Sequence, residues 1–431
     1  MSLNISGEDI YLWACDLFPI CRSITGDGVR ETFKYIKSFL PDLEVHEVPT
    51  GTKAFDWVVP QEWNVNDAYV LDPEGRKIID FKECNLHLVN YSIPFKGSMS
   101  LQALQEHLYS LEDQPDAIPY VTSYFKPRWG FCISHKQRQD LIDGTYHIVV
   151  DTTLEDGSMT YGECFLEGES KEEILLSTYT CHPSMGNNEL SGIVVTIALA
   201  KWLSSLPNRR YSYRIVWVPE TIGAIVYLSR NWEQMKQQTK AGYVVTCVGD
   251  DRTYSYMESR KGDTLADRVA KAVLREHYPD FKNYSFLERG SDERQYCSPG
   301  IALPVASIMR SKYAEYPEYH TSLDNLDLIS EGGLYGSFEV YKKCIHLLEK
   351  NANIKSKGLC EPQMGKRGLR GSLNGSKNID NQSMLFSNIL AYADGEMDLV
   401  DYLNLLDVPL LDLLNAIEVL EDQKLIDLFC G

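Results

Sequence analysis

The stretch STYTCHPSMGNNELSGIVV, residues 177–195, joins two apolar segments through a short polar turn. The segment EEILLSTYTCH (172–182) is typical of a buried strand, and the segment SGIVVTIALAKWLSSL (191–206) is typical of a buried helix. The turn between them contains a histidine, two amides and a carboxylate: His182, Asn187, Asn188 and Glu189. In open α/β sheets ligands bind beyond the carboxyl ends of the strands, so a turn of this composition marks a candidate site.

The same alternation of strand and helix continues along the chain. Further predicted strands are YSYRIVWVPE (211–220), AGYVVTCVGD (241–250) and LPVASIM (303–309). Further predicted helices are IGAIVYLSRNWEQMK (222–236), TLADRVAKAVLREHY (264–278) and GGLYGSFEVYKKCIHLLEK (332–350). Strands separated by helices imply crossover connections, so the sequence predicts a mainly parallel, doubly wound sheet with helices on both faces.

Changes in composition divide the rest of the chain into predicted domains. We predict a discontinuous α/β core from residues 1–50 and 151–355, interrupted by a small inserted β-rich domain over 51–150, where Tyr, Trp, Phe, Pro and Asn cluster. Residues 356–384 are rich in Gly, Asn and Lys and are predicted to be a linker. Residues 385–431 show helical periodicity with short turns, the pattern of a winged-helix-like α domain.

Composition limits the classes of function. The 431-residue chain has a formal net charge of −19, and this acidic excess argues against nucleic-acid or anionic-membrane partners, because both require a basic surface. No apolar run reaches the ~18–20 residues that a membrane span needs. The eleven cysteines are scattered without a CxxC pair, and no secretory leader is visible in the printed sequence, so we expect a cytoplasmic protein with reduced thiols.

The predicted C-terminal domain is itself strongly acidic. Winged helices often bind DNA, but phosphate contacts need Lys or Arg on the recognition face. From Leu385 onward Lys424 is the single basic residue, against Asp394, Glu396, Asp398, Asp401, Asp407, Asp412, Glu418, Glu421, Asp422 and Asp427. We therefore expect this domain to contact protein, either in a homo-oligomer or with another partner, rather than DNA.

Four polar residues are predicted to meet at one edge of the sheet. His182, Glu220 and Asp250 end three predicted strands, and the loop YPEYHTSLDN delivers His320 before the last helix. Taken singly, a histidine after a strand is usually a hydrogen-bonded loop residue, and an acidic residue there usually caps the next helix. Their coincidence at one edge favours a shared metal or catalytic cleft, and imidazole with carboxylate is a ligand set that suits zinc.

Five motifs in this order resemble those of co-catalytic zinc aminopeptidases. They are HPSMGNNELSG (182–192), PETIGAIVYLS (219–229), CVGDD (247–251), GSDERQY (290–296) and YHTSLDN (319–325). The chain also resembles a bacterial group of aminopeptidase-like proteins that have an inserted β domain and a C-terminal winged-helix-like domain. The strings RSITGDGVR and VPTGTKAFDWVVPQEWN near the front extend that resemblance over nearly the whole chain.

The resemblance implies a zinc exopeptidase fold, a peptide or small amide as substrate, and a role for each matching residue. His182 would be the first metal ligand, Asn188 would occupy the place of a bridging aspartate, and Asp250 and His320 would complete the metal site. Glu220 would be the general base that acts on a metal-activated water. The implied reaction is hydrolysis of an N-terminal peptide bond or a related amide bond.

Three positions depart from the family pattern. Asn188 is a neutral amide, which is a weaker ligand than a carboxylate and seldom bridges two ions. Thr221 stands where a second glutamate ligand is usual, and Ser184 replaces the aspartate that orients the first histidine. Glu189 is a candidate substitute for the bridging residue. We therefore expect one zinc ion on His182, Asp250 and His320, with two ions as the alternative.

The loop GSDERQYCSPG (290–300) holds candidates for substrate binding. Asp292, Glu293 and Arg294 are interpreted as ligands for the free amine or the carboxylate of a substrate, and a salt-bridged surface loop is the alternative. Arg310 and Tyr313 line the same approach and are weaker candidates.

The leading hypothesis is a zinc-dependent exopeptidase, most simply an aminopeptidase. One rival is an amidohydrolase of the same fold that acts on another amide, such as an N-acyl sugar, because members of the similar bacterial group are often encoded beside polysaccharide-biosynthesis genes. The other rival is a metal-poor binding or scaffold protein, which Asn188, Thr221 and Ser184 favour.

Overall fold

The computed structural model describes residues 5–124, 126–369 and 381–429. Residues 370–380, which belong to the predicted linker, lie outside the described residues. The chain forms two compact units, one of residues 1–266 and 282–339 and one of residues 267–281 and 340–431.

The first unit contains a mixed sheet of eight strands in the order β1-β10-β12-β11-β13-β16-β14-β15. The four central strands β12, β11, β13 and β16 are parallel. Toward the edges, β10 pairs antiparallel with β12 and with β1, and β14 pairs antiparallel with β16 but parallel with β15. The strands are β1 (Glu44–Pro49), β10 (Ser158–Leu166), β11 (Glu173–Tyr179), β12 (Ser212–Val218), β13 (Thr239–Val244), β14 (Ser255–Met257), β15 (Lys282–Tyr284) and β16 (Val305–Met309). The mainly parallel sheet predicted from the sequence is confirmed.

Helices cover both faces of this sheet. The chain passes from β11 through α5 (Ser191–Ser205) to β12, and then through α6 (Ile222–Gln238) to β13 on the other side of β11. Because parallel crossovers are right-handed, this reversal places α5 and α6 on opposite faces. Every residue of β11, β12 and β16 is buried, as expected for parallel strands covered twice.

Helix α5 lies inside the protein rather than at its surface. Residues 191–200 are all buried, because α1 (Gly7–Leu17) and α2 (Asp27–Phe39) pack against α5 from outside. The apolar run after the polar turn is therefore a central core helix, and it fixes the position of that turn.

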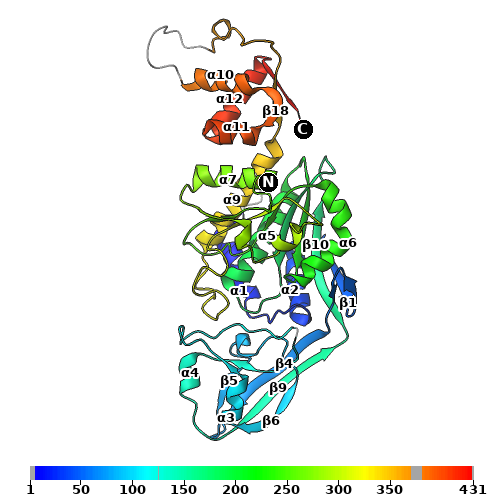
Figure 1. The fold of residues 1–431 in the computed structure, drawn as a ribbon, viewed down its shortest axis with the longest axis vertical. Helices are drawn as coiled ribbons and strands as arrows, with labels where there is room; N and C mark the ends of the chain where they lie inside the picture. Colours follow the sequence, from blue (N-terminus) through cyan, green and yellow to red (C-terminus); the bar gives the residue numbers. More distant parts are fainter. Residues whose placement is uncertain (1–4, 125, 370–380, 430–431) are drawn as a thin grey trace. The chain divides into compact units, whose positions relative to one another are not determined.

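A second, antiparallel sheet forms in the predicted inserted region. It has the order β5-β4-β9-β6, from β4 (Glu62–Leu71), β5 (Lys77–Asp80), β6 (Phe95–Ser100) and β9 (Thr145–Glu155) (Figure 1). Two short helices, α3 (Leu101–Leu104) and α4 (His135–Gln139), belong to the same region. One of its loops contacts the loop between β16 and α9: the amide of Tyr120 donates to the carbonyl of His320 at 2.8 Å, and Pro119 forms an isolated β-bridge with Thr321.

The second unit contains the winged-helix domain. Strands β18 (Asp394–Asp398), β17 (Asn353–Ser356) and β19 (Ile426–Phe429) form an antiparallel sheet in that order. The helices are α10 (Asn381–Tyr392), α11 (Leu399–Leu406) and α12 (Leu410–Asp422), with most of α7 (Leu265–His277) and the second half of α9 (Glu331–Lys350). The predicted winged-helix architecture is confirmed, and β17 adds a strand from before the predicted linker. Among the described residues, no helix has both the length and the apolar character needed to cross a membrane.

Candidate functional site

Three of the predicted site residues follow neighbouring parallel strands. His182 follows β11, Glu220 follows β12 and Asp250 follows β13, while His320 lies in the loop between β16 and α9. Strand β11 lies between β12 and β13, so the strand order reverses there. This is the position at which open α/β sheets bind ligands.

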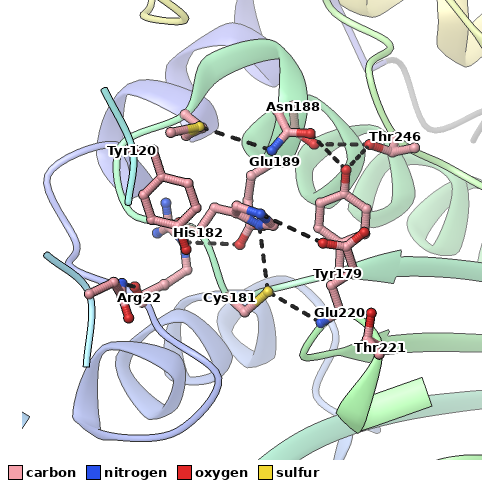
Figure 2. Close-up of polar contacts among 12 residues, drawn as sticks. Arg22, Tyr120, Tyr179, Cys181, His182, Asn188, Glu189, Glu220, Thr221 and Thr246 are labelled. Atoms are coloured by element: carbon pink, nitrogen blue, oxygen red, sulfur yellow. Dashed lines mark hydrogen bonds and ion pairs between the residues drawn. The ribbon is translucent and has the colours of Figure 1, made fainter. Parts of the chain in front are cut away.

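The polar turn after β11 is a buried π-helical segment, Gly186–Leu190. Its amide groups at Asn187 and Asn188 donate to the two carboxylate oxygens of Asp324, at 2.6 and 3.0 Å. Single π-helical turns occur frequently at functional sites, because the widened turn redirects a side chain. Here the turn directs Glu189 back toward His182 (Figure 2).

His182 is held between two carboxylates. Its Nδ1 lies 2.7 Å from Oε2 of Glu189, and its Nε2 lies 3.7 Å from Oε2 of Glu220 (Figure 2). Burial raises the pKa of Glu189 to about 8, whereas the neighbouring charge of Arg22 favours its ionised form. In that form the carboxylate can only accept, so that Nδ1 is the donor and Nε2 keeps its lone pair. Burial lowers the pKa of His182 to about 3, so the ring is neutral at physiological pH.

The contact between Glu189 and His182 corrects one sequence-based inference. Ser184 had suggested that no group orients the first histidine, but Glu189 does so from seven residues further along the chain. The Ser184 hydroxyl instead donates to the carbonyl of Phe18 at 2.6 Å and accepts from Nδ2 of Asn85 at 2.7 Å. Because the connection runs through a π-helical turn, neither strand nor helix periodicity pointed to it.

Arg22 is a further site residue that the sequence analysis did not identify. It is fully buried, its Nε donates to the carbonyl of His182 at 3.0 Å, and the same atom lies 3.4 Å from Oε1 of Glu189. Burial raises the pKa of Glu189 and Arg22 opposes that rise. A buried guanidinium without a counter-charge would be very costly, so we interpret the two groups as an ion pair.

Glu220 shares its surroundings with Asp292. The amide of Thr221 donates to Oδ1 of Asp292 at 2.8 Å, and Arg294 donates to the Thr221 hydroxyl at 2.6 Å. Burial and the charge of Asp292 raise the pKa of Glu220, and burial raises the pKa of Asp292 to about 7. Asp292 is fully buried, whereas the side chain of Glu220 is 23% exposed. Neighbouring carboxylates tend to share one proton, so this pair can both accept and release a proton.

His320 faces His182, with the ring centroids 5.3 Å apart. Burial, with a smaller contribution from His182, lowers the pKa of His320 to about 3. Its Nε2 is buried and has no hydrogen-bond partner within the described part of the chain. Tyr120 of the inserted region lies against both imidazoles, with centroid distances of 5.3 Å to each, and Tyr319 stacks on His320 at 3.9 Å.

Asp250 is engaged in hydrogen bonds to the sheet edge. Its carboxylate accepts from Nδ2 of Asn187, from the amide of Arg252, and from both the amide and the hydroxyl of Ser311, at 2.9–3.0 Å. These four bonds use the four lone-pair sites that a carboxylate offers. A role as a metal ligand requires Asp250 to release one of them, and that role stays a prediction.

Asn188 is also engaged within the protein. Its Oδ1 accepts from the Tyr179 hydroxyl at 2.9 Å, and its Nδ2 lies 4.0 Å from the sulfur of Met185. Thr246 donates to its main-chain carbonyl at 2.9 Å. The neutral amide is thus fixed in place, and its role at the position of a bridging carboxylate stays a prediction.

The predicted substrate-binding residues separate into two groups. Asp292 and Arg294 lie beside the turn that carries Glu220. Glu293 is buried and accepts from the hydroxyl of Tyr313 at 2.6 Å, and the guanidinium of Arg310 donates to the main-chain carbonyl of Asp250. In the first group Arg294 is exposed and Asp292 is fully buried, whereas the second group supports the framework around Glu220. The substrate-binding roles stay predictions.

The donor atoms at this edge fit one zinc ion better at Nε2 of His182 than at Nδ1. Among the described residues, Cys181, His182 and Glu189 have potential ligand atoms within 4.8 Å of one another. Three facts disfavour a metal ion on this group. Nδ1 of His182 is already hydrogen-bonded to Glu189, and the positively charged Arg22 lies beside Glu189. Burial also raises the pKa of the Cys181 thiol well above its usual value. The Nε2 atoms of His182 and His320 are the more suitable imidazole donors, and the carboxylate of Glu220 lies 3.7 Å from Nε2 of His182.

Comparison with known families assigns both parts of the chain. The family described as "Domain of unknown function (DUF4910)" matches residues 11–351, and a winged helix-turn-helix family matches residues 352–428. A relative from Clostridium acetobutylicum is 46% identical over 92% of this chain and 91% of its own length. That protein is described as a "Putative polysaccharide biosynthesis protein with aminopeptidase-like domain". The chain belongs to the DUF4910 family.

Solved structures confirm the predicted aminopeptidase-like fold. A crystal structure described as a "putative peptidase" from Clostridium acetobutylicum superposes with a TM-score of 0.91 and 43% identity, covering 98% of this chain and 96% of that one. The zinc aminopeptidase BSAP of Bacillus subtilis has a TM-score of 0.58 and 12% identity, covering 81% of this chain and 96% of that one. An aminopeptidase of Aneurinibacillus sp. strain AM-1 has a TM-score of 0.51 and 13% identity over 79% of this chain and 93% of that one. The last two show the fold alone.

Proposed function

We propose that this protein is a metal-dependent hydrolase of the exopeptidase type, most simply an aminopeptidase that cleaves an N-terminal peptide or related amide bond. The observation that carries the proposal is the pair of neutral imidazoles, His182 and His320, facing each other beside Glu220. They lie where the strand order of an aminopeptidase-like sheet reverses.

The ion proposed for this site is a single zinc, held by Nε2 of His182 and of His320. When bound, zinc polarises the substrate carbonyl and lowers the pKa of water. One ion is favoured over two because Asn188 is neutral and hydrogen-bonded, and because the Thr221 side chain is bonded to Arg294. Asp250 becomes a third protein ligand if it gives up one hydrogen bond.

Glu220 and Asp292 are proposed to move the proton. Glu220 accepts a proton on its carboxylate from the attacking water and returns it to the leaving amine. Burial and then the charge of Asp292 raise the pKa of Glu220 above its usual value, which suits a group that must both accept and donate. Its Oδ2 is buried and lacks a hydrogen-bond partner among the described residues, and this atom is the proposed contact for the substrate's free amine.

A second candidate substrate is an amide on a sugar. It is favoured by the name of the Clostridium acetobutylicum relative, which mentions polysaccharide biosynthesis. The same residues would act on an N-acyl group, but the substrate would then have no free amine for Asp292. Asp292→Asn is therefore predicted to raise KM for an aminoacyl substrate and to leave KM for an N-acyl sugar nearly unchanged.

The proposal is tested by hydrolysis assays on zinc-loaded protein. The substrates are aminoacyl amides, dipeptides and N-acetylated amino sugars, and Glu220→Gln is the matched inactive control. Hydrolysis of any of these that is lost in the control supports the proposal and identifies the substrate class. A protein that binds zinc fully but hydrolyses none of them would instead be a binding or scaffold protein.

We further propose that the winged-helix domain binds protein rather than DNA. In the second unit, Arg268 is neutralised by Asp398 and Asp401, at 2.8 and 2.5 Å. Exposed apolar side chains also occur in this unit, including Leu411 and Phe429. Self-association measured by sedimentation, together with the absence of a gel shift at moderate salt, would support this assignment, and DNA binding would contradict it.

A further inference from the structure

Arg22 contacts both the ring-orienting carboxylate and the backbone of His182. Its Nε donates to the His182 carbonyl at 3.0 Å and lies 3.4 Å from Oε1 of Glu189, whose other oxygen is bonded to the His182 ring. Its Nη1 donates to the carbonyl of Leu17 at 2.9 Å, which anchors the guanidinium to the end of α1. Two groups that determine the position of the His182 ring, Glu189 and the His182 carbonyl, therefore meet at one side chain (Figure 2).

The arrangement is not optimised for stability alone. Nη2 of Arg22 and Oε1 of Glu189 are both buried without a hydrogen-bond partner among the described residues. A buried ion pair with unmet hydrogen bonds gains little net stability, because the desolvation cost offsets the attraction. A role other than stabilising the fold is therefore needed to explain a fully buried arginine at this position. The contact of Arg22 with His182 suggests such a role.

We propose that Arg22 is a positioning residue that holds Glu189 and the His182 carbonyl so that His182 keeps a bare Nε2 directed toward Glu220. A histidine that binds metal through one nitrogen commonly donates its other N–H to a fixed acceptor, and loss of that acceptor weakens metal binding. In this chain the acceptor is Glu189, and Arg22 fixes the acceptor. The geometry assigns to Arg22 and Glu189 the orientation of the His182 ring, whereas the Ser184 hydroxyl is hydrogen-bonded elsewhere.

The direct test is the tautomer of His182 in the metal-free protein. Histidine labelled with ¹⁵N reports which ring nitrogen carries the proton, and His182→Gln identifies the signal among the nine histidines. Wild type is expected to show the proton on Nδ1, and Arg22→Met is expected to lose this single tautomer. Arg214→Met is the matched control, because Arg214 is also a buried arginine in an ion pair but lies at the opposite ends of the strands.

Zinc affinity gives a second readout by competition with a chelator. Arg22→Met is expected to weaken zinc binding about 10–100-fold, whereas Arg214→Met leaves it unchanged. This arm rests on the proposed metal site, and the tautomer arm does not. A wild type that binds no zinc but shows the Nδ1–H tautomer would therefore refute the metal site while leaving the positioning role of Arg22 intact.

The proposal fails if Arg22→Met keeps both the wild-type tautomer and the wild-type zinc affinity, whatever happens to its stability. If Arg22→Met does not fold, Glu189→Gln replaces it, since the amide has nearly the same volume. Glu189→Gln is expected to disturb the His182 tautomer and to weaken zinc binding in the same way. Unchanged values in that variant would equally overturn the proposal.

Discussion

The two ends of the central strands bury ionic groups in different ways. At the amino ends of β11 and β12, Arg214 donates through Nε to both oxygens of Glu173, at 3.0 and 2.9 Å, and through Nη1 to the hydroxyl of Tyr227 at 2.8 Å. At the carboxyl ends, Arg22 and Glu189 approach to 3.4 Å without a well-formed hydrogen bond. The charged groups of the first cluster are hydrogen-bonded within the protein, whereas Nη2 of Arg22 and Oε1 of Glu189 in the second are not.

Unpaired polar atoms concentrate at the carboxyl end. Among the described residues, buried atoms without partners there are Arg22 Nη2, Glu189 Oε1, Asp292 Oδ2, Glu293 Oε2 and His320 Nε2. Each such atom costs about 1–3 kcal/mol in a protein interior. A single unpaired atom carries little information. Several of them at one edge of a sheet indicate a site where a bound ligand supplies the missing partners.

Backbone strain is also present at the carboxyl edge. Ser184, Thr221, Cys247 and His320 have φ values of 39°, 65°, 52° and 57°, and each lies at or near the carboxyl edge. Left-handed backbone is unfavourable for residues other than glycine, most of all for a β-branched residue such as Thr221. Strain of this kind gathers at functional sites, where the surrounding structure holds it in place.

The largest expected effect at the carboxyl end is on catalysis. Glu220→Gln keeps the shape of the side chain but cannot accept a proton, so kcat is predicted to fall about 10⁴-fold, equivalent to about 5 kcal/mol. Steady-state kinetics on the substrate found by the hydrolysis screen measure this, with zinc content as the control. Residual activity above a tenth of wild type would exclude Glu220 as the proton acceptor.

The sequence predicted the fold more completely than the site. Mostly apolar strands such as β11 and β12 are typical of strands buried on both faces, so the parallel sheet and the edge carrying His182 and Glu220 followed from the sequence pattern. The partners of those residues did not follow, since they arise from tertiary contacts. Arg22 comes from the segment between α1 and α2, and Tyr120 comes from the inserted region.

At the amino end the expected effect is on stability alone. Arg214→Met leaves the buried carboxylate of Glu173 without its partner and is predicted to lower the free energy of unfolding by about 3–5 kcal/mol. Metal affinity and kcat are expected to stay at wild-type values below the unfolding transition. Chemical denaturation with parallel kinetics tests this, and a selective loss of zinc affinity would erase the contrast between the two ends.

Asp292→Asn is predicted to stabilise the metal-free protein. The pKa of Asp292 is raised to about 7 in the folded state, so folding opposes its ionisation. The stability this carboxyl contributes is present below its unfolded pKa and is lost as pH rises toward 7. The variant should therefore match wild type near pH 4 and exceed it by on the order of 2–4 kcal/mol at pH 8. Unfolding curves at both pH values would refute this if the difference did not grow with pH.

The two histidines are predicted to destabilise the metal-free protein in acid. Their pKa values are lowered to about 3 in the folded state, so the unfolded chain binds protons that the folded chain cannot. Their contribution to stability is present above pH 6.5 and decreases as pH falls, by about 2 kcal/mol per histidine at pH 5. His320→Gln should remove about half of this pH dependence, and an unchanged slope would show that His320 titrates normally.

Zinc binding by the purified chain, measured beside two variants, tests the central claim most directly. The account predicts about one zinc per chain in wild type. It also predicts loss of tight binding in His320→Gln, and a stoichiometry that rises toward two in Asn188→Asp, where a carboxylate replaces the amide. A wild type that takes up no zinc from excess free zinc, or a His320→Gln variant that binds it with wild-type affinity, would contradict the account.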